Sequence, residues 1–147
     1  MSTITSTRRL NRLDRRKLVT TAAVLVGDVA VLLAFIGVGL LVHSIEPWQY
    51  PLHTLRTTTP FFLAWVAIAP LLGVYRRRTL SSYYRTLWLT ILAWVLVSIV
   101  GAYIRATSYF PGGAPLEFLI VNIGFGLLFV LPWRVAVTLL VRRFLPP

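Results

Sequence analysis

The stretch that decides the fold lies near the amino terminus, where residues 18–45 read LVTTAAVLVGDVAVLLAFIGVGLLVHSI. A helix needs about 20 predominantly apolar residues to span the hydrocarbon core of a bilayer. This run exceeds that length, and Asp28 is its only acidic or basic residue before His43. The run therefore predicts a transmembrane helix with one carboxyl group near its middle.

Three more apolar runs follow, at residues 59–75, 86–104 and 116–141. Periodicity does not separate a buried helix from a buried strand in such runs, but their length favours helices. Inside lipid, backbone groups must bond within a helix or a closed barrel, and these runs are too few for a barrel. We predict one all-α domain over residues 1–147, an integral membrane antiparallel four-helix bundle preceded by a basic segment at residues 1–17.

Composition supports this class and excludes several functions. Of 147 residues, 57% are hydrophobic and 13% are charged, whereas a soluble domain has about 25% charged residues. The chain has no cysteine, two histidines and four acidic residues, so we predict no catalytic residues, no metal site and no cofactor. The net charge of +11 comes from basic clusters beside apolar runs, which predicts contact with the lipid bilayer and not with nucleic acid.

The distribution of basic residues predicts the orientation. Cytoplasmic loops of membrane proteins carry an excess of lysine and arginine. The segment before the first run, the second loop and the carboxyl-terminal tail are rich in them, and the first and third loops carry one each, Arg56 and Arg105. We therefore expect both termini to be cytoplasmic in a protein of the cell membrane. The first run is longer than the apolar part of a signal peptide, so we expect it to be retained.

Aromatic residues near the ends of the runs predict the two membrane boundaries. Trp and Tyr favour this depth because one end of each side chain is apolar and the other forms hydrogen bonds. We assign to the outer boundary Trp48, Tyr50, Tyr109 and Phe110, and to the inner boundary Tyr75, Tyr83, Tyr84, Trp88 and Trp133.

Asp28 is the most informative single residue. With Leu18 at the membrane surface, it lies about 15 Å deep, at a rise of 1.5 Å per residue. Arg134 stands eight positions before Arg142, and so lies about 12 Å from the same surface on an antiparallel fourth helix. A pair between the two residues would either fix the contact of two helices or form part of a proton or anion pathway.

Other candidates involve polar or aromatic residues. Arg105 ends the third run and Glu117 opens the fourth, where a helix dipole favours negative charge, so we expect a pair at the outer surface. Asn122 is expected to form a hydrogen bond between helices. Trp65 and Trp94 lie too deep for interface anchors, and they either fill the bundle or line a pocket for a flat apolar ligand.

Several short motifs resemble one prokaryotic membrane-protein family, catalogued as domain of unknown function 3054. They are Gly27-Asp28, Pro60-Phe61, Ala69-Pro70-Leu71-Leu72-Gly73, Arg105-Ala106-Thr107 followed by Phe110-Pro111-Gly112-Gly113, and Trp133-Arg134. The resemblance covers nearly everything after Leu18. It implies the four-helix fold and singles out Asp28, Arg105 and Arg134, but it implies no substrate.

Three functions fit these expectations. The first is a non-enzymatic accessory or structural subunit that packs against a membrane-protein partner or forms a homo-oligomer. The second is a small oligomeric transporter or channel that uses Asp28 and Arg134. The third is a binder of a lipophilic cofactor, such as a quinone, carotenoid or porphyrin, near Trp65 and Trp94.

Overall fold

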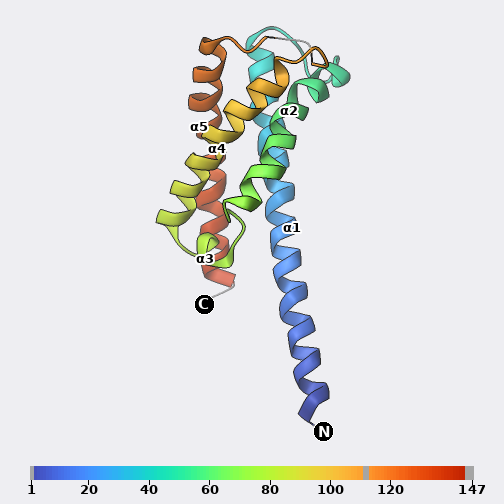
Figure 1. The fold of residues 1–147 in the computed structure, drawn as a ribbon, viewed down its shortest axis with the longest axis vertical. Helices are drawn as coiled ribbons and strands as arrows, with labels where there is room; N and C mark the ends of the chain where they lie inside the picture. Colours follow the sequence, from blue (N-terminus) through green and yellow to red (C-terminus); the bar gives the residue numbers. More distant parts are fainter. Residues whose placement is uncertain (1, 111–112, 145–147) are drawn as a thin grey trace.

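The apolar runs form long α-helices, the arrangement in which each backbone polar group bonds within its own segment. The computed structural model describes residues 2–110 and 113–144, and in the first helix the side chains of Arg15 and of residues from Leu18 onward. All regular secondary structure in this described part is helical (Figure 1). It comprises α1 (Ser2–Val42), α2 (Pro51–Leu71), α3 (Arg77–Leu80), α4 (Tyr83–Arg105) and α5 (Leu116–Phe144).

Three of the described helical segments are long and apolar enough to cross a membrane: residues Leu18–Val42 of α1, and the whole of α4 and α5. The helix α2 is less apolar because its first half carries His53, Arg56 and three consecutive threonines. Its apolar part begins at Pro60 and measures about 18 Å, at 1.5 Å per residue, which is shorter than a bilayer core of about 30 Å. The all-helical class is thus confirmed, and the chain has the character of a membrane protein.

The boundaries of α2 differ from the predicted range of 59–75. The helix begins at Pro51, whose fixed φ suits the first turn. Three of its threonines bond back to carbonyl groups one turn earlier, including Thr58 to Thr54 at 2.8 Å, which satisfies these hydroxyl groups within the helix. The buried Thr57 hydroxyl has no partner among the described atoms. It ends at Leu71, and Gly73 then adopts a φ of +73°, a left-handed conformation that glycine adopts readily.

The helix α4 lies between α2 and α5, and α1 packs against α5 and α2. Contacts between Thr86 and Thr138 and between Ser98 and Asn122 show that α4 and α5 run in opposite directions. The first part of α1 extends well beyond the other helices (Figure 1). The short α3 packs against the ends of α4 and α5, so it covers the interior at that end.

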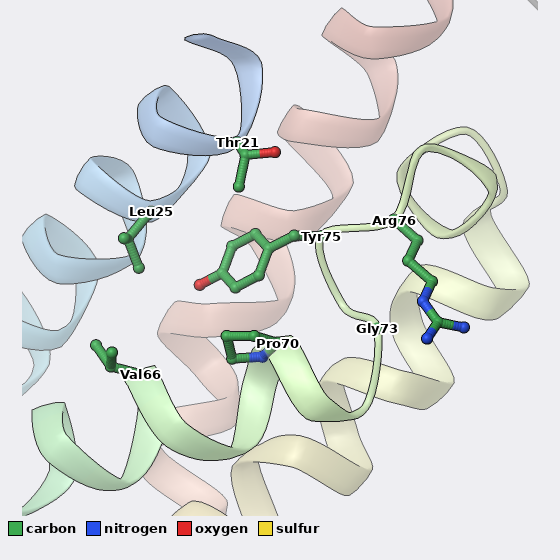
Figure 2. Close-up of a pocket in the computed structure, with 7 residues that line it drawn as sticks. All are labelled: Thr21, Leu25, Val66, Pro70, Gly73, Tyr75 and Arg76. Atoms are coloured by element: carbon green, nitrogen blue, oxygen red, sulfur yellow. The ribbon is translucent and has the colours of Figure 1, made fainter. Parts of the chain in front are cut away.

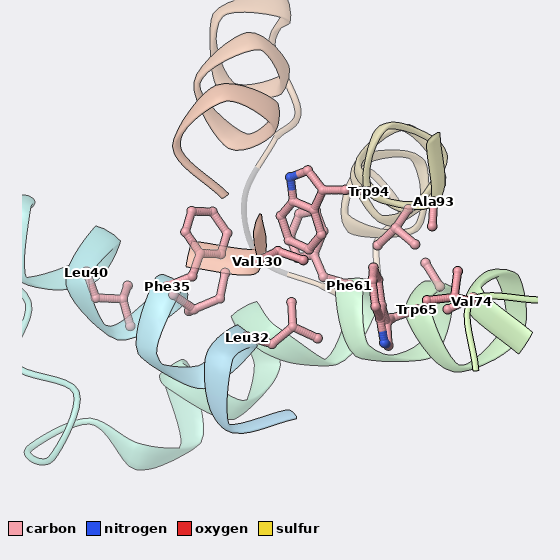
Figure 3. Close-up of a cluster of buried hydrophobic side chains, with 13 residues drawn as sticks. Leu32, Phe35, Leu40, Phe61, Trp65, Val74, Ala93, Trp94 and Val130 are labelled. Carbon is pink, nitrogen blue, oxygen red and sulfur yellow. The ribbon is translucent and has the colours of Figure 1, made fainter. Parts of the chain in front are cut away.

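The largest side chains of the buried hydrophobic core are aromatic, namely Phe35, Phe61, Trp65 and Trp94 (Figure 3). The rings of Trp65 and Trp94 lie 6.1 Å apart, and Phe35 meets Trp94 edge to face at 5.6 Å. Such pairs stabilise a core beyond the area that they bury. Trp94 fits because it lies against Gly126 of α5, where a Cβ atom would stand 2.1 Å from the Trp94 Cζ2 atom.

Replacement of Gly126 by alanine tests this fit. We expect Gly126→Ala to lower the free energy of unfolding by about 1–3 kcal/mol, because the added methyl group displaces the buried Trp94 indole. Gly124, half a turn away, has no neighbouring atom within 4 Å of its ideal Cβ position. The control Gly124→Ala should therefore be neutral or slightly stabilising, since alanine favours helices. Thermal unfolding in detergent measures both, and equal melting temperatures would contradict the packing.

Candidate functional site

Asp28 lies on the buried face of α1. It stands one turn after Val24 and one turn before Leu32, and both of these neighbours are buried. Residues four apart share a helix face, so the apolar stripe that packs α1 onto the rest of the molecule carries Asp28 inward with it. Only 3% of the residue is exposed.

Four side chains from other parts of the chain donate hydrogen bonds to the Asp28 carboxyl group. Its Oδ2 atom accepts from Arg134 Nη2 at 2.6 Å, from Tyr75 Oη at 2.5 Å and from Trp65 Nε1 at 3.2 Å. Its Oδ1 atom accepts from Trp133 Nε1 at 2.8 Å. We call these five residues the Asp28 cluster. It joins α1, α2, the turn after α2, and α5.

The hydrogen-bonding groups around Asp28 suit an ionised carboxylate. The indole nitrogens of Trp65 and Trp133 and the guanidinium of Arg134 are donors only. An ionised Asp28 accepts from all of them, whereas a protonated carboxyl group would have only the Tyr75 hydroxyl oxygen to which it could donate. The ion pair with Arg134 compensates the charge, which is otherwise costly to bury.

Arg134 of α5 is fully buried. Its guanidinium lies over two aromatic rings, 5.5 Å from the centre of Trp65 and 5.2 Å from that of Tyr75. Cation–π attraction of this kind becomes stronger when both groups are removed from water. The Nε and Nη1 atoms of Arg134 have no hydrogen-bond partner among the described protein atoms. The guanidinium is therefore held by its bond to Asp28 and by the two rings.

Four buried threonines of α3, α4 and α5 lie between the α3 end of the molecule and Arg134. We call Thr79, Thr86, Thr90 and Thr138 the threonine row. Thr86 donates to the Thr79 carbonyl at 2.6 Å, and Thr138 donates to Thr86 at 3.2 Å. Thr90 stands one turn beyond Thr86, and Arg134 one turn before Thr138, so the antiparallel register places Thr90 opposite Arg134. The Thr90 hydroxyl is buried and has no partner within the described part of the chain.

Gly27 allows Trp133 to reach the carboxylate. A Cβ atom at position 27 would stand 1.9 Å from the Trp133 Cζ2 atom. The indole therefore lies directly against the α1 backbone, and its N–H group reaches the side chain of the next residue, Asp28. Any larger residue at position 27 would push Trp133 away.

The structure brings Asp28 and Arg134 together, and it adds three residues to the pair. Trp65, expected as a filler or pocket residue, is a donor to Asp28. The expectation that Tyr75 and Trp133 direct their polar ends toward the inner membrane boundary is wrong, because both direct these atoms at Asp28. Two signals were present in the sequence: Trp133 adjoins Arg134, and Gly27 adjoins Asp28.

Trp94 and Asn122 serve helix packing. The Asn122 side chain donates to Ser98 of α4 at 2.9 Å, and Trp94 donates to the Asn122 carbonyl at 3.3 Å. The crevice beside Trp65, Trp94 and Asp28 does not admit a water-sized sphere. These two indoles fill the interior, and no space for a flat ligand separates them.

The expected pair between Arg105 and Glu117 is not formed among the described residues. Arg105 lies over the ring of Phe118 at 4.9 Å, and its Nε atom donates to the Gly113 carbonyl at 3.4 Å. Adjacent residues on a helix point about 100° apart, so Glu117 turns away when Phe118 faces Arg105. Glu117 is exposed.

A double-variant comparison tests the pairing of Asp28 and Arg134. We expect Asp28→Ala to lower the free energy of unfolding by about 3–5 kcal/mol, because it leaves a buried guanidinium without its counter-charge. The double variant Asp28→Ala with Arg134→Leu should be less destabilised than this single variant. Thermal unfolding in detergent provides the comparison, and additive losses in the double variant would rule out the pair.

Comparison with known proteins places this cluster within a family. A family model described as "Protein of unknown function (DUF3054)" matches residues 25–137, which include all five members of the Asp28 cluster. No match was found among curated proteins or among solved structures. The match covers most of the chain and confirms the resemblance seen in the motifs. The chain belongs to the DUF3054 family.

Proposed function

We propose that this protein is a non-enzymatic structural or accessory subunit of a membrane complex, in which the Asp28 cluster fixes the mutual positions of α1, α2 and α5. In this proposal the chain crosses the cell membrane four times as an antiparallel bundle, with both termini in the cytoplasm. Its partner is another membrane protein or a second copy of the chain.

The closed environment of Asp28 is the observation that carries the proposal. Both carboxylate oxygens are used by donors from other segments, and the crevice beside them does not admit a water-sized sphere. A transport site needs access for water or ions, whereas a structural site needs a counter-charge and donors for its buried carboxylate. The arrangement of donors around Asp28 suits the structural role.

Two features support α2 as a fourth crossing. Its buried face, including Phe61 and Trp65, packs into the same core as α4. Its polar first turns bring Arg56 and His53 to the end of the molecule that carries the loop before α5. A helix with a short apolar section is more easily accommodated when neighbouring helices cover part of it.

The outward faces support a role in assembly. On α5 the exposed large side chains include Ile120, Val121, Leu128 and Leu139. Exposed apolar surface of this kind faces lipid or another membrane protein. The small number of acidic residues and histidines and the absence of cysteine provide little material for catalysis.

Single-cysteine labelling tests the topology in this cysteine-free chain. We expect Gln49→Cys and Ser108→Cys to react with a membrane-impermeant maleimide added to intact cells, because both positions are exposed in loops at the outer end. Arg78→Cys, at the opposite end, should react only after the cells are opened. External labelling of position 78 would overturn the proposed orientation.

The threonine row favours a second candidate function, a small oligomeric transporter or channel. Thr138 donates to the Thr86 hydroxyl, and Thr86 donates to the Thr79 carbonyl. The Thr90 hydroxyl, which has no partner among the described residues, stands one turn farther along α4 toward Arg134. Hydroxyl groups and water can form chains that conduct protons, and ionisable residues within membranes often belong to such paths. In this reading Asp28 would exchange a proton with the threonine row through a water molecule, because the Arg134 guanidinium keeps its protons.

Replacement of Asp28 by asparagine separates the two functions. Asparagine is nearly isosteric but does not carry charge, so it removes a bond to a charged group worth about 1.5–3 kcal/mol. A structural Asp28 predicts a lower melting temperature or altered oligomer size, with no proton or ion flux from the parent protein in sealed vesicles. Flux that the parent protein supports and Asp28→Asn abolishes, at unchanged oligomer size, would establish the transporter instead.

A further inference from the structure

A groove of about 280 Å³ lies between α1 and α2 at the α3 end of the molecule (Figure 2). Thr21 and Leu25 of α1 form one wall, and Val66 and Pro70 of α2 form the other. The remaining lining residues, Gly73, Tyr75 and Arg76, come from the turn after α2. Almost all of its surface is apolar, and we call it the α1–α2 groove.

The base and the mouth of the groove differ in chemistry. Figure 2 shows the ring of Tyr75 between the two helices, and its hydroxyl group continues inward to Asp28 and Trp65. Arg76 lies at the mouth, is exposed, and forms no ion pair with any described residue. Its side chain folds over Gly73, where a Cβ atom would lie 2.8 Å from Arg76 Cδ.

We propose that the α1–α2 groove binds one anionic phospholipid of the cytoplasmic leaflet, with part of an acyl chain between Leu25 and Val66 and the phosphate beside Arg76. This inference goes beyond the structural role of the Asp28 cluster and does not depend on it.

The depth of the groove fits a lipid of that leaflet. Thr21 and Leu25 lie about 5 Å and 10 Å inside Leu18, at 1.5 Å per residue, which is the acyl region next to the headgroups. Arg76 lies in the turn after α2, immediately before α3, and long basic side chains near helix ends can extend their charged groups toward headgroups.

Charge complementarity favours an anionic headgroup over a zwitterionic one. The same end of the molecule carries exposed arginines in α3 and at the end of α5: Arg77, Arg78, Arg142 and Arg143. Among the described acidic residues, Asp28 is paired with Arg134, and Glu46 and Glu117 lie at the opposite end. No described carboxylate therefore neutralises Arg76 from within the chain.

The size of the groove favours one acyl chain over a ring compound. Sites for small organic molecules usually enclose about 300–1,000 Å³ on several sides. At about 280 Å³ the α1–α2 groove lies at the lower end of this range, and almost all of its surface is apolar. A flexible chain can follow such a surface, whereas a rigid ring system would project from it.

Lipid titration of the purified, delipidated full chain tests the proposal. Native mass spectrometry would count bound molecules of phosphatidylglycerol, phosphatidylcholine and oleate. We expect one saturable phosphatidylglycerol site. Because that lipid also covers Tyr75, we expect it to raise the melting temperature by about 4 °C or more at saturation.

Two variants, each with a matched control, locate the site. Val66→Trp fills the groove and should abolish saturable binding, whereas Leu63→Trp, one turn away on an exposed position outside the lining, should not. Arg76→Gln keeps both apolar walls and should weaken phosphatidylglycerol binding roughly fivefold, the effect of about one basic residue near a headgroup. Arg78→Gln is the matched control on α3.

Several outcomes would overturn the proposal. Equal affinity for phosphatidylcholine would exclude selection of an anionic headgroup, and preferential binding of oleate would identify a carboxylate ligand instead. Binding that survives Val66→Trp would place the lipid elsewhere on the surface. If Val66→Trp does not purify as a single species, the phosphatidylglycerol affinities of Arg76→Gln and Arg78→Gln are compared instead. Equal affinities of these two variants would exclude the site.

Discussion

The rest of the structure depends on the burial of one carboxylate. Asp28 lies in the middle of an apolar helix, where an uncompensated charge would be too costly to keep. Compensation comes from four donors on three other segments. These bonds all form together in the mutual arrangement of α1, α2 and α5 that the structure shows. Buried ion pairs often contribute more to the uniqueness of a fold than to its stability, and this cluster has the geometry for that role.

Small residues determine how closely the helices approach around this cluster. Gly27 accepts the Trp133 indole and Gly126 accepts that of Trp94, each with no space left for a methyl group. Between helices in lipid, close packing and hydrogen bonds replace the hydrophobic effect as the main source of association. The same indoles contribute both, because Trp133 and Trp94 also donate hydrogen bonds to α1 and α5.

Tyr75 connects the two functional features of the molecule. Its hydroxyl group completes the shell of Asp28, and its ring forms part of the α1–α2 groove. The buried cluster is closed to water, but the groove is open toward the surrounding medium. A lipid in the groove would contact the cluster through this single side chain, so lipid composition and the packing of α1 against α2 would be coupled.

Sequence alone determined the helical class and the membrane character, and it allowed a pair between Asp28 and Arg134, because these follow from the length of apolar runs and the constant rise of a helix. It did not reveal that Tyr75 and Trp133 turn inward, since an aromatic residue near a helix end has the same local pattern in either orientation. It also placed Glu117 opposite Arg105, where the rotation of α5 presents Phe118 instead. Rotation about a helix axis and the match between a glycine and an indole are decided by contacts between distant segments, which only the tertiary structure defines.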